Sequence, residues 1–235
     1  MAEILSIRSE RIDDIPSRLA QLDRMGVQPL LDEHVPTHGN WVGLSLGWVT
    51  VLWLTHILSE ADHRLNHVQP WAKQRLQTLC GATGQRVHPL DLGDDRLAAV
   101  REAWSQDERW QAFEGAFTHH LLCVYDLQAE RVRLDATTAS GYWRVNEDGL
   151  VQFGHSKDHR PDLPQVKVML SVLDPLGLPV ATDVVPGQRA DDPRYLPAIT
   201  RVRESLGQRG LAVRRRRQDG RAGDPGQYSS RWRLL

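Results

Sequence analysis

The feature of this sequence that most restricts its fold is a change of hydrophobic period near residue 126. Before that point apolar residues recur at spacings of three and four, which places them on one face of an α-helix. The first such set is Ile12, Ile15, Leu19 and Leu22. After that point apolar and polar residues alternate, as they do along a half-buried β-strand. The pattern predicts an α+β protein, with a helical domain at residues 1–126 followed by a sheet.

The longest apolar stretch, residues 41–58, predicts a buried helix within the helical domain. Polar residues interrupt this stretch, and a membrane-spanning helix needs roughly 20 mainly apolar residues. The N-terminal sequence MAEILSIRSERIDD has charges where a signal peptide needs its apolar region, so we expect a cytoplasmic protein with no membrane partner. Further helices are predicted to begin near Asp94 or Asp95 and near Asp107.

Three strands and one helix are predicted in the second half of the chain. The strands cover residues 131–137, 166–173 and 178–185, and a turn joins the last two. The helix that follows has Asp191 or Asp192 as its N-cap and Pro193 at its first position. A strand parallel to the first one should come next. The sequence there, AVRRRRQDGRAGDPGQYSSRWRLL, has neither a helix nor a strand period.

Positive charge is concentrated at the end of the sequence. Residues 212–235 hold seven arginines and two acids, so a chain with a net charge of −1 carries −6 on its remaining residues. G+C-rich coding DNA produces an excess of arginine over lysine by itself, and this excess alone therefore does not indicate DNA binding. The two cysteines, Cys80 and Cys123, lack metal-ligand spacing, which gives no support to a zinc site or a disulfide.

Asp135 is the candidate catalytic residue of the sheet domain. It lies inside a predicted strand, after Val132 and Leu134 and before two threonines. A carboxylate is costly in such a place unless it has a partner, and a metal ion is one such partner. For an isolated LDATT sequence the alternative is a carboxylate that faces solvent from an edge strand, beside Arg133.

Three motifs follow one another in the second half: LDATT, GHSKDHRPDLPQ and PGQRADD. A loop of mixed charge, such as the second motif, is usually a solvated connection. The identity and the order of the three motifs, from residue 131 to about residue 206, nevertheless resemble the bacterial insertion-sequence transposases of the DDE superfamily. The resemblance implies a ribonuclease-H-like core, and the helical segment before it is similar to the N-terminal domain of these transposases.

The resemblance also implies a metal-dependent site and a DNA partner. The family's core holds two Mg²⁺ ions with two Asp and one Glu, and its first Asp corresponds to Asp135, as a catalytic and metal-binding residue. Paired metals activate water for strand cleavage and then a DNA 3′-hydroxyl for strand transfer. Lys157, His159 and Arg160 are candidate contacts to DNA phosphates. The implied partners are transposon-end DNA and either a second copy of the chain or a full-length transposase.

The sequence departs from the family at the place of the second acid. The family's second Asp ends the fourth strand, directly after the helix, and this chain has four arginines there, at residues 214–217. Asp183, Asp191 and Asp192 lie where the family places no acid, and the family's third acid would lie beyond Leu235. We therefore expect an incomplete catalytic site, in which Asp135 is the remaining member.

A shift of reading frame explains the departure. Back-translation of residues 212–220 with CGN arginine codons, read from the second base of the alanine codon, permits Leu-Tyr-Val-Gly-Asp-Gly-Lys-Met. This is an apolar strand that ends in Asp, and the degeneracy of the code leaves other readings open. Residues 127–210 are then a partial catalytic core, and residues 211–235 are an out-of-frame tail that we expect to be disordered.

Two other functions fit the same sequence. A truncated chain that pairs with full-length transposase, or that occupies transposon ends, is a non-catalytic regulator. A decayed gene product has no function. The arginine run, with Tyr228 and Trp232, also permits contacts to phosphates or bases, whereas an out-of-frame tail has no such role. Whether the chain is an enzyme stays open at this stage.

Overall fold

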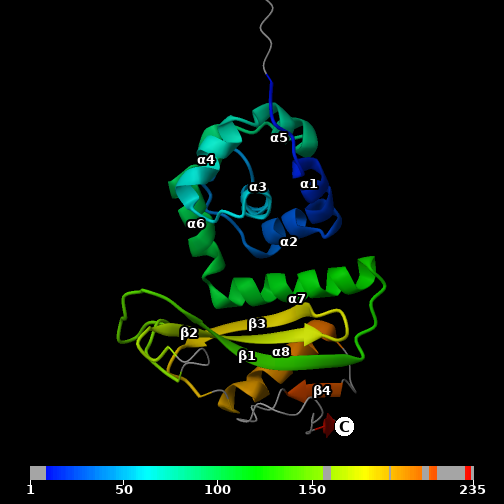
Figure 1. Cartoon of the computed structure of the whole chain (residues 1–235). Helices are drawn as coiled ribbons and strands as arrows, with labels where there is room; N and C mark the ends of the chain where they lie inside the picture. The colour runs from blue at the N-terminus through cyan, green and yellow to red at the C-terminus, as the bar shows by residue number, and fades with distance from the viewer. Residues whose placement is uncertain (1–8, 156–159, 191, 208–211, 216–230, 234–235) are drawn as a thin grey trace, which may run out of the picture. The chain divides into compact units, whose positions relative to one another are not determined.

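The chain divides into two compact units, Met1–Phe113 and Glu114–Leu235, which we call the helical unit and the sheet unit. The computed structural model describes residues 9–155, 160–190, 192–207, 212–215 and 231–233, the last two ranges by their backbone (Figure 1). The division falls inside helix α7 (Asp107–Val124), whereas the sequence pattern places the domain boundary at residue 126, just after this helix. The α+β class is as predicted.

The helical unit is built around helix α3 (Leu46–Glu60), which the other helices of the unit surround (Figure 1). Four of them and a short 3-10 helix pack directly against it. The other elements are α1 (Ile15–Arg24), α2 (Val27–His34), α4 (Leu65–Lys73), α5 (Leu76–Thr83), η1 (Pro89–Leu92) and α6 (Asp94–Trp104). Their short lengths leave most of the unit's stability to the packing of apolar faces on α3.

Helix α3 confirms the buried helix predicted from the apolar stretch, with a start five residues into that stretch. The hydroxyl of Ser45 accepts a hydrogen bond of 3.3 Å from the backbone N–H of Trp48, so Ser45 is the N-cap. Val49 and Leu52 are fully buried. The predicted starts at Asp94 and Asp107 are confirmed for α6 and α7. Within the described ranges, no helix is long and apolar enough to cross a membrane.

The sheet unit contains five described strands in the order β3-β2-β1-β4-β5. Their bounds, with those of the helical segments between them, are β1 (Arg131–Ser140), β2 (Gln165–Leu173), β3 (Leu178–Pro186), η2 (Asp192–Arg194), α8 (Tyr195–Leu206), β4 (Ala212–Arg215) and β5 (Arg231–Arg233). Strands β1, β2 and β3 are antiparallel neighbours, as the predicted hairpin requires. Strand β4 runs parallel to β1, and β5 runs antiparallel to β4.

Strand β4 corrects the expectation that no strand follows the helix. The backbone of Ala212–Arg215 pairs in parallel register with β1, from Arg131↔Ala212 to Leu134↔Arg215. A strand of this kind is invisible to the sequence pattern because backbone hydrogen bonds to β1 form it, and these do not depend on alternation of side chains. The expected count of three strands is therefore too low, and the expected tail without structure does not hold for the residues of β4 and β5.

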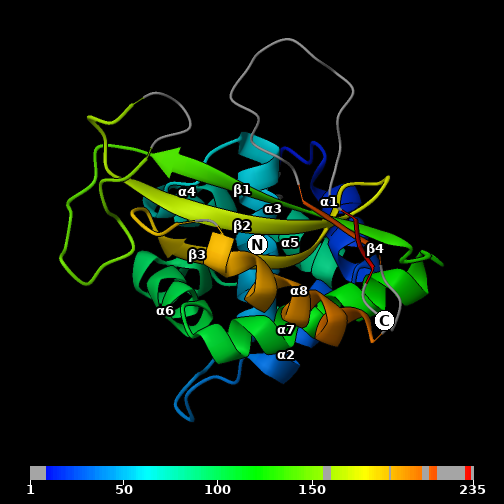
Figure 2. The same cartoon turned by 90° about the horizontal axis from the view of Figure 1, so that it is seen from below.

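One core of the sheet unit lies between the sheet and α8. Helix α8 contributes Ala198, Val202 and Leu206, and strand β1 contributes Val132 and Leu134. Figure 2 shows α8 crossing the strands of the sheet. The helix begins at Tyr195, later than predicted, because residues 192–194 form a 3-10 turn before it. Proline tolerates such a turn as readily as the first turn of an α-helix.

Candidate functional site

Asp135 lies in the middle of β1 and is half-buried. Alternate side chains of a strand share a face, so Asp135 lies on the same face as Arg133 and Thr137, opposite to the face that packs on α8. On β2 its cross-strand partner is Leu170. The guanidinium of Arg133 lies 3.3 Å from the carboxylate of Asp174 and is therefore paired away from the strand centre. Strand β1 has β2 beside it along nearly its whole length and, among the described residues, β4 on its other side up to Leu134.

Among the described residues, the parallel pairing of β1 with β4 extends as far as the residue before Asp135. Leu134 and Arg215 are the last described pair, and Asp135 is the next residue of β1. The next position after β4 is Arg216, which lies outside the described residues. We call this end of the described pairing, at Leu134 and Arg215, the β1–β4 junction.

Of the three candidate DNA contacts, the structure describes one. Lys157 and His159 lie outside the described residues. The guanidinium of Arg160 makes two hydrogen bonds to the carboxylate of Asp162, at 2.9 and 2.8 Å. The Asp162 carboxylate and, less strongly, the hydroxyl of Tyr142 hold the pKa of Arg160 above its ordinary value. Arg160 is thus already engaged with an acid of its own loop, which weakens its candidacy as a phosphate contact.

Gln165 joins the two loop motifs at the start of β2, a connection that the sequence analysis missed. Its backbone exchanges hydrogen bonds of 2.9 and 3.0 Å with Gln152. Its fully buried side chain donates from Nε2 to the carbonyl oxygens of His155, at 3.0 Å, and Gly187, at 3.1 Å. His155 belongs to GHSKDHRPDLPQ and Gly187 to PGQRADD, so one amide group holds both motifs beside β2.

Two glycines allow these backbones to approach. A Cβ atom on Gly154 would collide with the carbonyl oxygen of Gly187, and a Cβ atom on Gly187 would collide with that of Gln165. Any larger residue at either position would force the backbone to shift. A glycine in each motif, with a glutamine at the start of the strand between them, is the sequence signal by which this junction could have been found.

A second buried group ties the segment after β3 to the sheet. Lys167 is buried, which is rare for lysine, and its Nζ donates to the backbone carbonyl of Arg189 at 2.6 Å. In the register of β1 and β2, Thr138 lies opposite Lys167 and Ser140 lies opposite Gln165. Directly opposed residues share a face, so four polar side chains gather at this end of the sheet. Gln165 and Lys167 bond the loop segments, and all four side chains lie on the face opposite to Asp135.

A buried ion network, also absent from the sequence analysis, joins α7, β3 and α8 within the sheet unit. Arg201 of α8 pairs with Glu114 of α7 and with Asp183 of β3, and it donates to the carbonyl of Thr182 at 3.0 Å. The side chains of Arg201 and Glu114 are 12% and 10% exposed. Burial raises the pKa of Glu114, and the nearby charge of Arg201 opposes this rise. Asp183 is thus an ion-pair partner of Arg201.

The described residues around Asp135 do not fit a two-metal site. Mg²⁺ takes oxygen ligands in a near-octahedral shell, and paired ions need several carboxylates to bridge them. The neighbours of Asp135 on its face, Arg133, Thr137 and Leu170, supply one hydroxyl and no carboxylate. In the part of the chain that the structure describes, no group of three or more His, Cys, Asp or Glu side chains is arranged to hold a metal ion.

Comparison of the chain with family models, with curated proteins and with solved structures finds no match.

Proposed function

We propose that this chain is the leading part of an insertion-sequence transposase of the DDE kind, with a ribonuclease-H-like core that lacks its second acid. Its function is then DNA transposition in the intact protein, and the chain as it stands does not cleave or join DNA. Asp135 is the retained catalytic carboxylate. The motifs LDATT, GHSKDHRPDLPQ and PGQRADD carry the resemblance on which this proposal rests.

One structural observation supports the proposal beyond the motifs. The helix after β3 leads into a strand, β4, that lies parallel to β1, and the last described pair, Leu134 and Arg215, comes one residue before Asp135. One permitted reading of the gene places an aspartate at position 216, one residue after Arg215, and the degeneracy of the code leaves other readings open. In that one reading, Asp135 and the aspartate both come one position after the last described pair, Leu134 and Arg215. Neighbouring parallel strands bring such positions together.

A non-catalytic regulator is the second candidate. Each unit has buried residues of its own, and β4 pairs with β1 although its sequence is rich in arginine. A folded chain is what occupation of transposon ends or pairing with a complete transposase would require, and this is the observation behind the regulator as second candidate.

The proposed function is tested by restoring the alternative frame. A gene read from the second base of the Ala212 codon should encode a continuous chain with an apolar strand that ends in Asp and, later, a helix with Glu. Its product should cleave linear DNA that carries the transposon ends in the presence of Mg²⁺ or Mn²⁺, whereas the present chain should not. The first check is the nucleotide sequence itself, because stop codons crowding that frame would exclude the explanation.

Two substitutions make the activity test specific. In the restored chain, Asp135→Asn should abolish cleavage, because the substitution removes a metal-binding carboxylate. Asp148→Asn is the matched control, since Asp148 is exposed in the segment between β1 and β2 and lies outside the junction of β1 and β4. Specific nicking by the present chain that disappears in Asp135→Asn would show that the other acids have been misplaced.

A further inference from the structure

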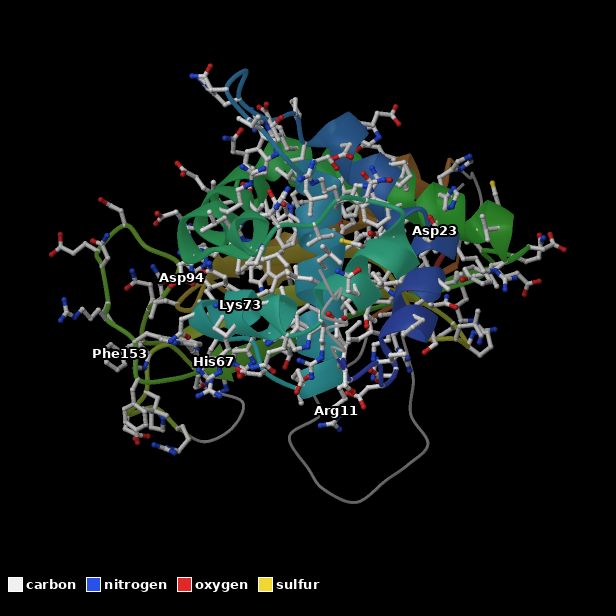
Figure 3. The ribbon with its side chains drawn as sticks, turned by 90° about the horizontal axis from the view of Figure 1, so that it is seen from above. Arg11, Asp23, His67, Lys73, Asp94 and Phe153 are labelled. Atoms are coloured by element: carbon white, nitrogen blue, oxygen red, sulfur yellow. The ribbon has the colours of Figure 1, made fainter. Side chains whose placement is uncertain are left out.

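The helical unit has a pocket of about 720 Å³ whose lining is cationic. It is formed by the segment before α1 and the end of α4, and the residues around it are Ser9, Arg11, Pro70, Lys73, Gln74 and Arg75. Figure 3 labels Arg11 and Lys73. Among the described residues the lining contains three cations and no carboxylate. A volume of this size is in the range of small-ligand sites and exceeds that of a single phosphate group.

The charge of the pocket contrasts with that of the rest of its unit. Residues 9–113 contain ten basic and fourteen acidic side chains, a net charge of −4. Three of the ten basic residues nevertheless line one pocket. Clustering of this kind in an acidic unit attracts an anion locally, while the surrounding surface repels it.

Arg75 is the buried member of the cluster. Its side chain is 8% exposed, and its Nη2 donates to Glu60 at 2.9 Å, which fixes the guanidinium in place. Its Nε–H is buried and has no hydrogen-bond acceptor among the described residues. Arg75 lines the pocket, and an unpaired buried donor of a charged group is costly, so the charge of an anion beside the guanidinium would lower this cost.

Arg11 and Lys73 complete the cluster from the solvent side. The side chain of Arg11 is 78% exposed, and its Nε lies 2.8 Å from a carboxylate oxygen of Asp13. Asp13 also lies 4.0 Å from Arg75, so one carboxylate holds both guanidinium groups near each other. Lys73, in the last turn of α4, makes no ion pair with any described residue and is exposed. Its ammonium group therefore has its hydrogen-bonding capacity available to a ligand.

We propose that this pocket binds a backbone phosphate of duplex DNA, with Lys73, Arg11 and Arg75 as donors. The choice of DNA rests on the proposed function, and the phosphate chemistry rests on the pocket. Three cationic hydrogen-bond donors from two separate segments suit a sugar–phosphate backbone, because the backbone presents successive anionic groups. A stretch of backbone also fills more of the pocket volume than one free ion does. Such contacts position the duplex and read no sequence.

The test uses the full-length chain with Arg214, Arg215, Arg216 and Arg217 changed to glutamine, which removes the other concentration of positive charge. In this background Lys73→Gln should weaken binding to duplex DNA several-fold and should lower the salt dependence of log K by about one. Arg86→Gln is the matched control, because Arg86 is exposed in the same unit and does not line the pocket. It should change neither quantity beyond its small effect on net charge.

A second measurement follows the pocket directly. The Nε–H resonance of Arg75 in the ¹⁵N spectrum should shift when duplex DNA is added, and this shift should be lost in Lys73→Gln. Equal binding by Lys73→Gln and Arg86→Gln, or an unmoved Arg75 signal, would overturn the proposal. A shift with inorganic phosphate but not with duplex DNA would also overturn it, in favour of a small-anion site. These outcomes are independent of DNA cleavage, so a failure here is distinguishable from a failure of the proposed function.

Discussion

Two buried titratable side chains, one in the helical unit and one in the sheet unit, are accommodated in opposite ways. In the helical unit His56 of α3 is 2% exposed, and burial lowers its pKa, so that the neutral ring is favoured. In the sheet unit Glu114 is buried against Arg201, and burial raises its pKa. One unit therefore accommodates a polar ring by keeping it uncharged, and the other accommodates a carboxylate by pairing it. The contrast predicts that lowering the pH should affect the stability of the two units differently. Loss of the ion-pair partner Arg201 should affect the sheet unit alone.

The largest expected effect is the loss of Arg201. Arg201→Met leaves Glu114 and Asp183 without their cation, and removal of one member of a buried ion pair costs about 3–5 kcal/mol. Hydrogen exchange should show this as reduced protection of β3 amides, while amides of α3 in the helical unit keep theirs. Arg203→Met, on the same helix, is the control and should change the free energy of unfolding by less than about 0.5 kcal/mol.

A double substitution separates the buried charge from the packing of the side chain. Arg201→Met with Glu114→Gln should recover a large part of the loss, because the uncompensated carboxylate of α7 is gone. If the double variant is as unstable as Arg201→Met alone, the network does not act through the buried charge of Glu114.

The next effect concerns the junction of the loop motifs. Gly187→Ala should destabilise the sheet unit by about 1–3 kcal/mol, since the new Cβ collides with the backbone carbonyl of Gln165. Gly115→Ala is a matched control in the same unit, where the Cβ would meet Ser205 Oγ at an ordinary 3.7 Å. In the middle of α7 it should stabilise by up to about 1 kcal/mol. Denaturant unfolding of both variants measures the change in the free energy of unfolding. No change in Gly187→Ala would contradict the close approach of the Gly187 and Gln165 backbones.

The predictable parts of the fold are those that local pattern determines. Helix α3 is apolar on all sides, and its N-cap is a serine, while the three long strands alternate and are closed by turns. Strand β4 could not be predicted in the same way, because its partner β1 lies about 80 residues earlier and its own side chains give no period. Strand β4 forms because its backbone pairs with that of β1, which is distant in sequence.

In the candidate site, too, the features that depend on local sequence could be predicted and those that depend on distant contacts could not. The strand position of Asp135 and its neighbouring motifs could be derived from the sequence, because a carboxylate within a strand pattern is a local feature. The partners of Arg201 could not, since Glu114 is 87 residues away and lies on another helix. The pocket of the helical unit was also missed, because its cations come from two segments that only the fold brings together.

The pH dependence of the helical unit provides a smaller effect. The folded-state pKa of His56 is below its ordinary value of 6.5, with Asp62, Glu60, His67 and Arg75 as the charged neighbours that modify it. A lowered folded pKa gives stability that is present above pH 6.5 and is lost as the pH falls through the folded value. Protection of α3 amides should therefore decrease on acidification, and His56→Phe should show less of this decrease. Identical pH profiles of the two proteins would contradict the role of His56.

The sheet unit should respond in the opposite sense. A raised folded pKa of Glu114 gives stability that is present below its ordinary value of 4.5 and is lost as the pH rises through the folded value. The difference in β3 protection between the wild type and Glu114→Gln isolates this contribution from that of the other carboxylates. Relative to the variant, the wild type should lose protection between pH 4.5 and neutrality, and a difference that does not change with pH would sink the assignment.

The smallest expected effect is that of Mg²⁺ on the Tm of the present chain. This measurement tests whether the sheet unit binds a metal ion. A ligand that binds the folded state stabilises it by RT ln(1 + [L]/Kd), which is about 2.7 kcal/mol at a concentration of 100 Kd. Among the described residues no group of three or more His, Cys, Asp or Glu side chains is arranged to hold a metal ion, and one carboxylate does not hold a pair of ions. Millimolar Mg²⁺ should therefore leave Tm unchanged, and Asp135→Asn should behave identically. The chain with the restored frame should gain in Tm with Mg²⁺, and this gain should vanish in its Asp135→Asn form. Stabilisation of the present chain that depends on Asp135 would mean that acids outside the β1–β4 junction complete the site.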